Sequence, residues 1–323
     1  MAYTPRPQFL LTLFRELFNT IIYSAGNDPL LARAHRLFQK DPAQTNNVLL
    51  LAPISLGIIL KLLIRYIISH VLMSILILES VDKQVNISQC RPLPQGGFRL
   101  LLNGIGSACT YWVMHSSLTK ISTTLLPTPV AYIIASVLLA ETHFFWTAHT
   151  ILPRNQLRFV PSPRDRRRWR ALALPTLIYS AAEAVMMYLP ALFNSILAPA
   201  SNQKVTIEGL SYIVRSDILI SVLMLFTQLS LLLPSYIVLI LVQASLLPPS
   251  CETLIFRRSR EQQQGIRVGE IFSAANRGPL QVREAAQMIG IRRLLYCLEM
   301  HGKMCLCLLV IAAMVHLMVY SIL

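Results

Sequence analysis

One stretch places a glutamate inside an apolar run of membrane-span character: Val137-Leu138-Leu139-Ala140-Glu141-Thr142-His143-Phe144-Phe145-Trp146-Thr147. A carboxylate in the hydrocarbon costs several kcal/mol, so it usually faces other helices or a water-filled cavity. Related phrases end two other apolar runs, where Glu79 and Glu252 are each followed by a hydroxyl residue. We expect these three helix ends to organise the rest of the chain.

The composition is that of a polytopic membrane protein. Hydrophobic residues make up 54% of the 323 residues and charged residues 14%, whereas soluble domains contain roughly 25% charged residues. The formal net charge is +14. Because the basic residues alternate with long apolar runs, this charge is better explained by the positive-inside rule than by nucleic-acid binding. We therefore expect membrane lipid, and no nucleic acid, as a partner.

Six apolar runs divide the chain after an N-terminal segment, 1–45, that is expected to be partly interfacial. About 20 helical residues cross a hydrocarbon layer about 30 Å thick, and each run reaches that length. The fifth run is long enough for one kinked span or for two. Two arginine-rich loops, 153–170 and 253–302, lie on the same side of the membrane only if this run crosses once, as the positive-inside rule favours. We therefore predict an all-α membrane protein, a six-span helical bundle. The runs are 46–81, 97–122, 130–152, 171–198, 209–252 and 303–323.

The spans pair into three helix–loop–helix units within a transmembrane domain of residues 46–323. The units are 46–122, 123–198 and 209–323, and the loop inside the third is much longer than the other two. Internal repeats of this kind are common in transporters. The sequence therefore predicts threefold pseudo-repeats.

This organisation resembles the mitochondrial carrier family, in which three repeats supply six tilted helices around a central cavity. The motif Pro-x-[Asp/Glu]-x-x-[Lys/Arg] ends each odd-numbered helix of that family and supplies the salt bridges of a gate. Glu79, Glu141 and Glu252 occupy the matching ends, so the resemblance makes them gate candidates, although the proline of the motif is absent before each. It also implies solute transport and a location in the mitochondrial inner membrane. The alternative is that each glutamate caps a span at the interface.

The phrase Ala140-Glu141-Thr142-His143-Phe144-Phe145-Trp146-Thr147 is also similar to fungal multi-span proteins, some of which carry the label ubiquitin carrier protein. The sequence contains no soluble conjugation domain, so we do not expect ubiquitin chemistry.

Three further charged residues lie inside apolar runs. Lys61 and Arg65 are four residues apart and therefore share a helix face. They could reach the headgroups or pair internally, or they could form the positive wall of a cavity that receives a small anionic solute. Glu183 lies in the fourth run and could pair with either cation or contact the solute.

No pattern in the sequence indicates an enzyme, a metal site or a cofactor. His143 and His149 are six residues apart, which is not the i, i+3 or i, i+4 spacing of a two-histidine metal site on a helix. No nucleophile motif or phosphate-binding loop is present, so we name no catalytic residue. We expect a carrier-like solute transporter with a central cavity. The alternative is a non-transporting membrane scaffold or adaptor that presents its arginine-rich loops.

Overall fold

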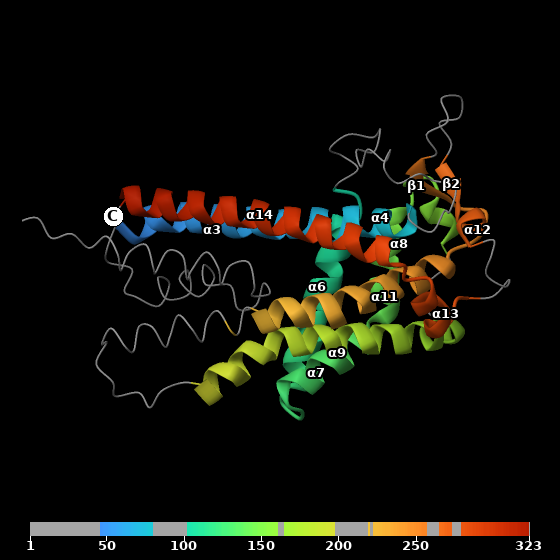
Figure 1. Ribbon diagram of the computed structural model, residues 1–323, viewed down its shortest axis with the longest axis horizontal. Coiled ribbons are helices and arrows are strands. Elements are labelled where there is room, and N and C mark those ends of the chain that lie inside the picture. The colour runs from blue at the N-terminus through green and yellow to red at the C-terminus, as the bar shows by residue number, and fades with distance from the viewer. Residues whose placement is uncertain are drawn as a thin grey trace, which may run out of the picture. The chain divides into compact units, whose positions relative to one another are not determined.

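The computed structural model describes residues 46–79, 102–160, 165–197, 219, 222–256, 265–272 and 279–322. These residues are mostly helical, which confirms the predicted class (Figure 1). The N-terminal segment 1–45 lies outside the described residues. The chain divides into two compact units, which are considered separately below. Unit 1 comprises residues 1–66, 186–227 and 301–323, and unit 2 comprises residues 67–185 and 228–300.

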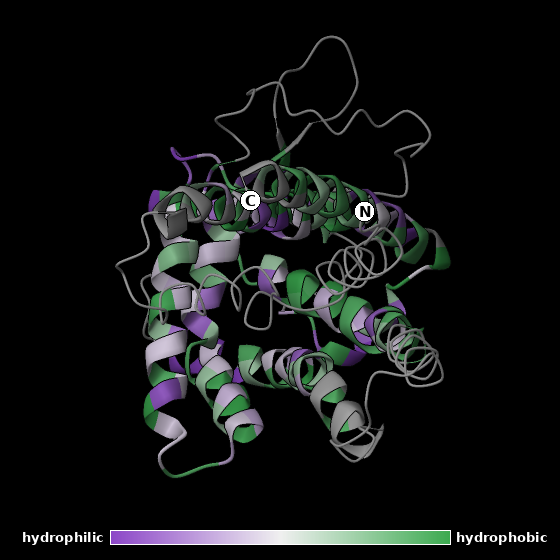
Figure 2. Ribbon diagram, turned by 90° about the vertical axis from the view of Figure 1, so that its left-hand side faces the viewer, coloured by the Kyte–Doolittle hydropathy of each residue, from purple (hydrophilic) through white to green (hydrophobic). Residues whose placement is uncertain are grey.

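Among the described residues, four helices are long and apolar enough to cross a membrane, so the length and composition of these helices fit an integral membrane protein. The candidate spans are Ser55–Leu78, Arg166–Leu189, Val222–Ser245 and Arg293–Val315. A bent pair of helices, α7 and α8, would make a fifth span. Figure 2 shows hydrophobic residues along most of the helices, interrupted by hydrophilic ones. Six spans and a threefold repeat stay predictions.

The first apolar run forms one nearly continuous helical rod. It consists of α3 (Asn46–Arg65), the π-helical segment η2 (Tyr66–Leu72) and α4 (Met73–Glu79). The π-helical segment widens the helix by one residue per turn, a feature that often occurs at functional sites. The segment contains His70, to which the candidate site returns below.

The third apolar run, which carries Glu141, is bent rather than straight. Helix α7 (Thr128–Leu138) and helix α8 (Ala140–Ile151) meet at Leu139 with an angle of 61° between them. Leu139 has φ −93° and ψ 15°, which is outside the helical region and breaks the regular pattern of the rod. Glu141 therefore lies in the first turn of a helix, where the helix dipole favours an acid.

Helix α6 (Ile105–Ser122) packs against both α7 and α8, and it is not among the candidate spans. The backbone turns into α6 at Gly104, whose φ of 81° is left-handed and favours glycine. The side-chain amide of the neighbouring Asn103 donates through Nδ2 to the backbone carbonyl oxygens of His149 (2.6 Å) and Leu152 (3.2 Å). These two bonds satisfy carbonyl groups at the end of α8 and tie it to the start of α6.

Two long helices begin earlier than their apolar runs suggested. Helix α9 (Arg166–Leu197) and helix α14 (Ile291–Ile322) each contain 32 residues, whereas the apolar runs began at 171 and 303. The additional N-terminal turns of both helices contain arginines. The aliphatic part of an arginine at a helix end can pack on apolar surface while its charged group reaches water. The side chain of Asp165 accepts a bond from the Arg167 amide (2.9 Å) and so caps the start of α9.

The core of unit 2 is built around α11 (Leu233–Ser245), which follows the π-helical segment η5 (Gln228–Leu232). Every residue from 233 to 244 except Pro234 is buried. Helix α11 packs against α4, α8 and α13 (Val282–Gln287). The core of unit 2 therefore surrounds α11, and the central cavity expected from the sequence stays a prediction.

The long loop 253–302 contains two short strands and further helices. Strand β1 (Glu252–Phe256) pairs antiparallel with β2 (Gly265–Arg267), and α12 (Val268–Ile271) follows directly. Leu280 donates its backbone amide to Ser245 Oγ (3.0 Å), which attaches the segment before α13 to the end of α11.

Unit 1 contains a close contact between helices α3 and α14, which lie side by side in Figure 1. A Cβ atom at Gly57 would lie 2.5 Å from Val315 Cγ2. The absence of a side chain at this position lets the two helices approach closely, as small residues do between membrane helices.

Candidate functional site in unit 2

Glu141 forms an ion pair with Arg168 of α9, and both side chains are largely buried. The distance between Arg168 Nε and Glu141 Oε1 is 3.6 Å, and the side chains are 4% and 17% exposed. The Arg168 guanidinium also lies over the rings of Phe144 (5.1 Å) and Phe145 (5.5 Å). Aromatic faces stabilise a cation that has lost water. The charge that the sequence placed in a span is therefore neutralised by an arginine from the beginning of the next helix.

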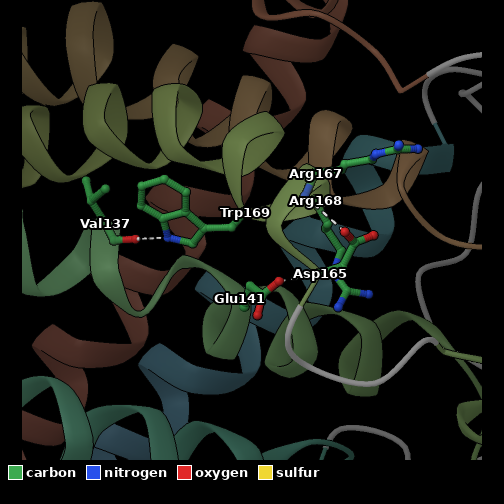
Figure 3. Close-up of polar contacts among 6 residues, drawn as sticks. All are labelled: Val137, Glu141, Asp165, Arg167, Arg168 and Trp169. Atoms are coloured by element: carbon green, nitrogen blue, oxygen red, sulfur yellow. Dashed lines mark hydrogen bonds and ion pairs between the residues drawn. The ribbon is translucent and has the colours of Figure 1, made fainter.

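A second polar contact joins the start of α9 to the end of α7, on the other side of the bend. Trp169 Nε1 donates to the carbonyl oxygen of Val137 at 3.1 Å. Figure 3 shows this bond beside the Glu141–Arg168 pair, with the Asp165–Arg167 cap on the other side. The bond gives the Val137 carbonyl group a hydrogen-bond partner. This group lies at the end of α7, next to the bend, where helix carbonyl groups lack a partner within the helix. We call Glu141, Arg168, Trp169 and Val137 the bend anchor.

The other two gate candidates lie at the ends of two different elements. Glu79 is the last residue of α4, and Glu252 is the first residue of β1, opposite Arg267 in the strand pair. Helix α4 and strand β1 pack against each other. The neighbouring Cys251 is buried, and burial raises the pKa of its thiol. A raised pKa keeps the thiol protonated and therefore a poor nucleophile.

The cavity candidates fall in both units. Lys61 and Arg65 lie in α3 within unit 1, where Lys61 is 2% exposed. Both residues have interaction partners. Glu183 lies in α9 within unit 2, at the centre of a second polar region.

That region is a group of aromatic and polar side chains contributed by six elements of unit 2. We call it the histidine–tyrosine cluster. It consists of His70 from η2, Tyr111 and His115 from α6, Tyr132 from α7, His143 and Trp146 from α8, Tyr179 and Glu183 from α9, and Tyr236 and Gln243 from α11. The sequence analysis identified only Glu183 among these residues as a site candidate.

Glu183 lies near Tyr132, Tyr111 and Tyr179, which come from three different helices. Tyrosines are therefore the neighbours of this acid, and no ion pair of Glu183 is found among the described residues. This setting differs from the charge neutralisation at Glu141.

Aromatic rings connect the three histidines of the cluster. The His70 ring lies 4.1 Å from Trp146, and the Trp146 ring lies 5.1 Å from His143. Tyr111 lies between His143 and His115, at 5.1 Å and 5.5 Å from their ring centroids. The histidines therefore form one continuous group although their sequence positions are far apart.

Short hydrogen bonds fix two of these histidines. His143 Nδ1 is 2.8 Å from Gln243 Nε2, and Thr147 Oγ1 donates to Gln243 Oε1 at 2.7 Å. His115 Nε2 is 2.8 Å from Ser136 Oγ. The third histidine, His70, has a longer contact: its Nδ1 lies 3.5 Å from Tyr236 Oη. Buried polar groups in apolar helices require such partners.

The described residues contain no group of three or more His, Cys, Asp or Glu side chains that could hold a metal ion. The histidines of the cluster are separated by Tyr111 and Trp146, so aromatic rings occupy the space between them. The arrangement favours proton binding, hydrogen bonding and ring stacking as its chemistry.

The sequence contained one signal for the cluster, namely polar residues inside apolar runs. His70, His115, His143 and Gln243 each interrupt such a run. The sequence contained no sign that these residues come together, because the contacts join residues as much as 166 positions apart.

No protein-family model, curated protein or solved structure matches the chain.

Proposed function

We propose that this protein is a membrane transporter and that the histidine–tyrosine cluster contributes to its solute pathway. The observation that carries the proposal is the position of Glu183 and three histidines within or beside membrane-length helices. Ionisable residues in such helices are rare because desolvation is costly, and they commonly mark substrate, ion or proton pathways. A protein without transport has no evident need to hold so many titratable groups together in apolar helices.

We further propose a small anion as the solute, because Lys61 and Arg65 are cations within one candidate span. The carrier-like organisation, with six spans, threefold repeats and gates at Glu79, Glu141 and Glu252, belongs to this proposal. So does a location in the mitochondrial inner membrane. No catalytic function is proposed.

A scaffold or adaptor is the second candidate, and the bend anchor favours it. Arg168 is immobilised by Glu141 and two aromatic rings, while Arg166, Arg167 and Arg170 of the same helix end are exposed. A fixed helix end with exposed arginines would suit permanent binding to a partner or to anionic headgroups.

Binding and flux of small anions distinguish the two functions. Purified protein in detergent is heated with inorganic phosphate or succinate, because a ligand that binds the native state raises the melting temperature. The protein is then reconstituted, and counterflow of radiolabelled phosphate or succinate is measured. A transporter gives saturable counterflow above that of protein-free vesicles, whereas a scaffold gives none.

Two sets of variants test the residues. Lys61→Gln with Arg65→Gln should reduce anion counterflow by at least about tenfold, if these cations contribute about 1.4 kcal/mol to solute binding. The matched control is Lys120→Gln, which removes an exposed cation from α6. Glu183→Gln should also reduce counterflow while the melting temperature stays close to that of the parent. Undiminished counterflow in both sets would exclude these residues from the pathway.

A further inference from the structure

We infer that solute transport is coupled to a proton and that His143 Nδ1 carries this proton. The side-chain amide of Gln243 is its hydrogen-bond partner and can rotate between two orientations, one for each protonation state of His143. The inference rests on the transport function proposed above. It concerns three side chains that join α8 to α11, and all three are at least 95% buried: His143 is 4% exposed, Thr147 5% and Gln243 1%.

The orientation of the Gln243 amide and the protonation state of His143 are linked. With Gln243 Nε2 2.8 Å from Nδ1 of His143, the amide nitrogen donates and Nδ1 accepts. Thr147 in turn donates to the amide oxygen at 2.7 Å. This arrangement fits a neutral His143 with its hydrogen on Nε2.

The same three groups also accommodate the charged form. A proton on Nδ1 would place two donors against each other, which a rotation of the Gln243 amide by half a turn relieves. The amide oxygen then accepts from Nδ1–H, and the amide nitrogen donates to Thr147 Oγ1, since a hydroxyl group both donates and accepts. Both hydrogen bonds persist in both protonation states, and no backbone movement is required.

His149, in the same helix, lacks this property. Its Nδ1 lies 2.7 Å from the backbone carbonyl oxygen of Phe145. A carbonyl oxygen only accepts, so Nδ1 must donate whatever the charge of the ring. His149 is therefore the natural comparison: its partner is fixed, whereas the partner of His143 can reverse.

The groups that face His143 come from every helix packed around it. Those that titrate are His70 from η2, Tyr111 and His115 from α6, Tyr179 from α9 and, through the tyrosines, Glu183. Glu183 is the acid of this set, and Tyr111 and Tyr179 lie between it and His143. A proton on His143 therefore adds a positive charge that a bound anion can balance.

The transport step conserves charge and atoms. A proton from water on one side forms the Nδ1–H bond, the anion binds, and both leave to water on the opposite side when that bond breaks. One proton with one monovalent anion moves no net charge across the membrane.

The test separates exchange from net uptake in proteoliposomes containing a pH-sensitive dye, with radiolabelled phosphate or succinate as the probe. Counterflow needs no net proton movement, whereas net uptake does. For the parent protein with the membrane potential held at zero, an outside that is one pH unit more acid should support about tenfold accumulation, the equilibrium value for one proton per solute whatever the charge of the solute. The dye should report proton entry together with the solute.

His143→Gln should lose accumulation and dye acidification more completely than it loses counterflow, because glutamine can bond to Gln243 but carries no proton. Thr147→Val should reduce accumulation, because the amide then lacks a partner in both positions. His149→Gln, the matched control, should behave as the parent.

The outcomes are separable. If the parent gives no counterflow, the transport function itself fails. If the parent gives counterflow that is indifferent to the pH gradient, or if His143→Gln still accumulates solute, proton coupling through His143 is overturned. Nitrogen NMR of histidine-labelled parent protein needs no variant: a His143 ring that keeps one protonation state from about pH 4 to about pH 8 would also overturn it.

Discussion

Glu141 and Glu183 are both acids in apolar helices of unit 2, and their surroundings stabilise them in opposite ways. Glu141 has a cation, Arg168, which is itself enclosed by Phe144 and Phe145. Glu183 has hydroxyl and aromatic neighbours, led by Tyr132. Glu141 is thus paired with a charged group, whereas Glu183 lies among tyrosines.

This difference distinguishes a structural ion pair from the acid that we propose for the solute pathway. The bend anchor joins the α7–α8 bend to the start of α9, and Glu141 is held there by its ion pair with Arg168. The histidine–tyrosine cluster holds several neutral groups that can accept or release protons or contact a solute. Three predictions test whether the two regions differ in this way, beginning with the largest effect on stability.

Glu141→Gln should lower the free energy of unfolding by about 3 kcal/mol, because it leaves the buried Arg168 without its counter-charge. The measurement is thermal or denaturant unfolding in detergent. Arg166→Gln, which changes an exposed arginine of the same helix, is the control and should have little effect.

The double variant Glu141→Gln with Arg168→Gln should recover a part of the loss, since it removes both charges. Additive effects of the two single variants would show that the pair has no coupling energy, and the bend anchor would then lose its ionic component.

Trp169→Phe should lower the free energy of unfolding by about 1 kcal/mol, the usual contribution of one hydrogen bond. The ring is retained, so the main loss is the bond to the Val137 carbonyl at 3.1 Å. Trp112→Phe offers a comparison, because Trp112 is 38% exposed in α6. A Trp169 variant as stable as the parent would indicate that water replaces the indole at the bend.

Glu183→Gln should change the free energy of unfolding by less than about 0.5 kcal/mol, because glutamine can still bond to Tyr132 and no buried cation loses its partner. The same unfolding assay, run beside Glu141→Gln, makes the comparison direct. A loss as large as that of Glu141→Gln would make Glu183 a structural acid and would remove the contrast between the two regions.

Much of the helical organisation was predictable because periodicity and hydrophobicity are local properties. Each predicted apolar run overlaps a described helix, and Val222–Ser245 is the candidate span among the described residues of 209–252. That the run crosses only once stays a prediction. The starts of α9 and α14 were misplaced, since hydropathy counts arginine as a break whereas a helix can retain it at its end.

The bend at Leu139 was not visible in the sequence. Neither proline nor glycine occurs between Val130 and Leu152, so no local signal marks a break in the run. Contacts with α6 and α9 accompany it, among them the Trp169 bond to Val137, and those partners come from other parts of the chain. The core around α11 depends in the same way on contacts with α4, α8 and α13.

The sequence by itself determined that long apolar helices alternate with basic segments and that Glu141 and Glu183 lie in unusual positions. Only the tertiary structure decided their partners: an arginine for Glu141, and tyrosine with a histidine group nearby for Glu183. The reason is physical. A charge in an apolar run must find a partner, but nothing local specifies which one, because the cost of burial is met by any group that packing brings within reach.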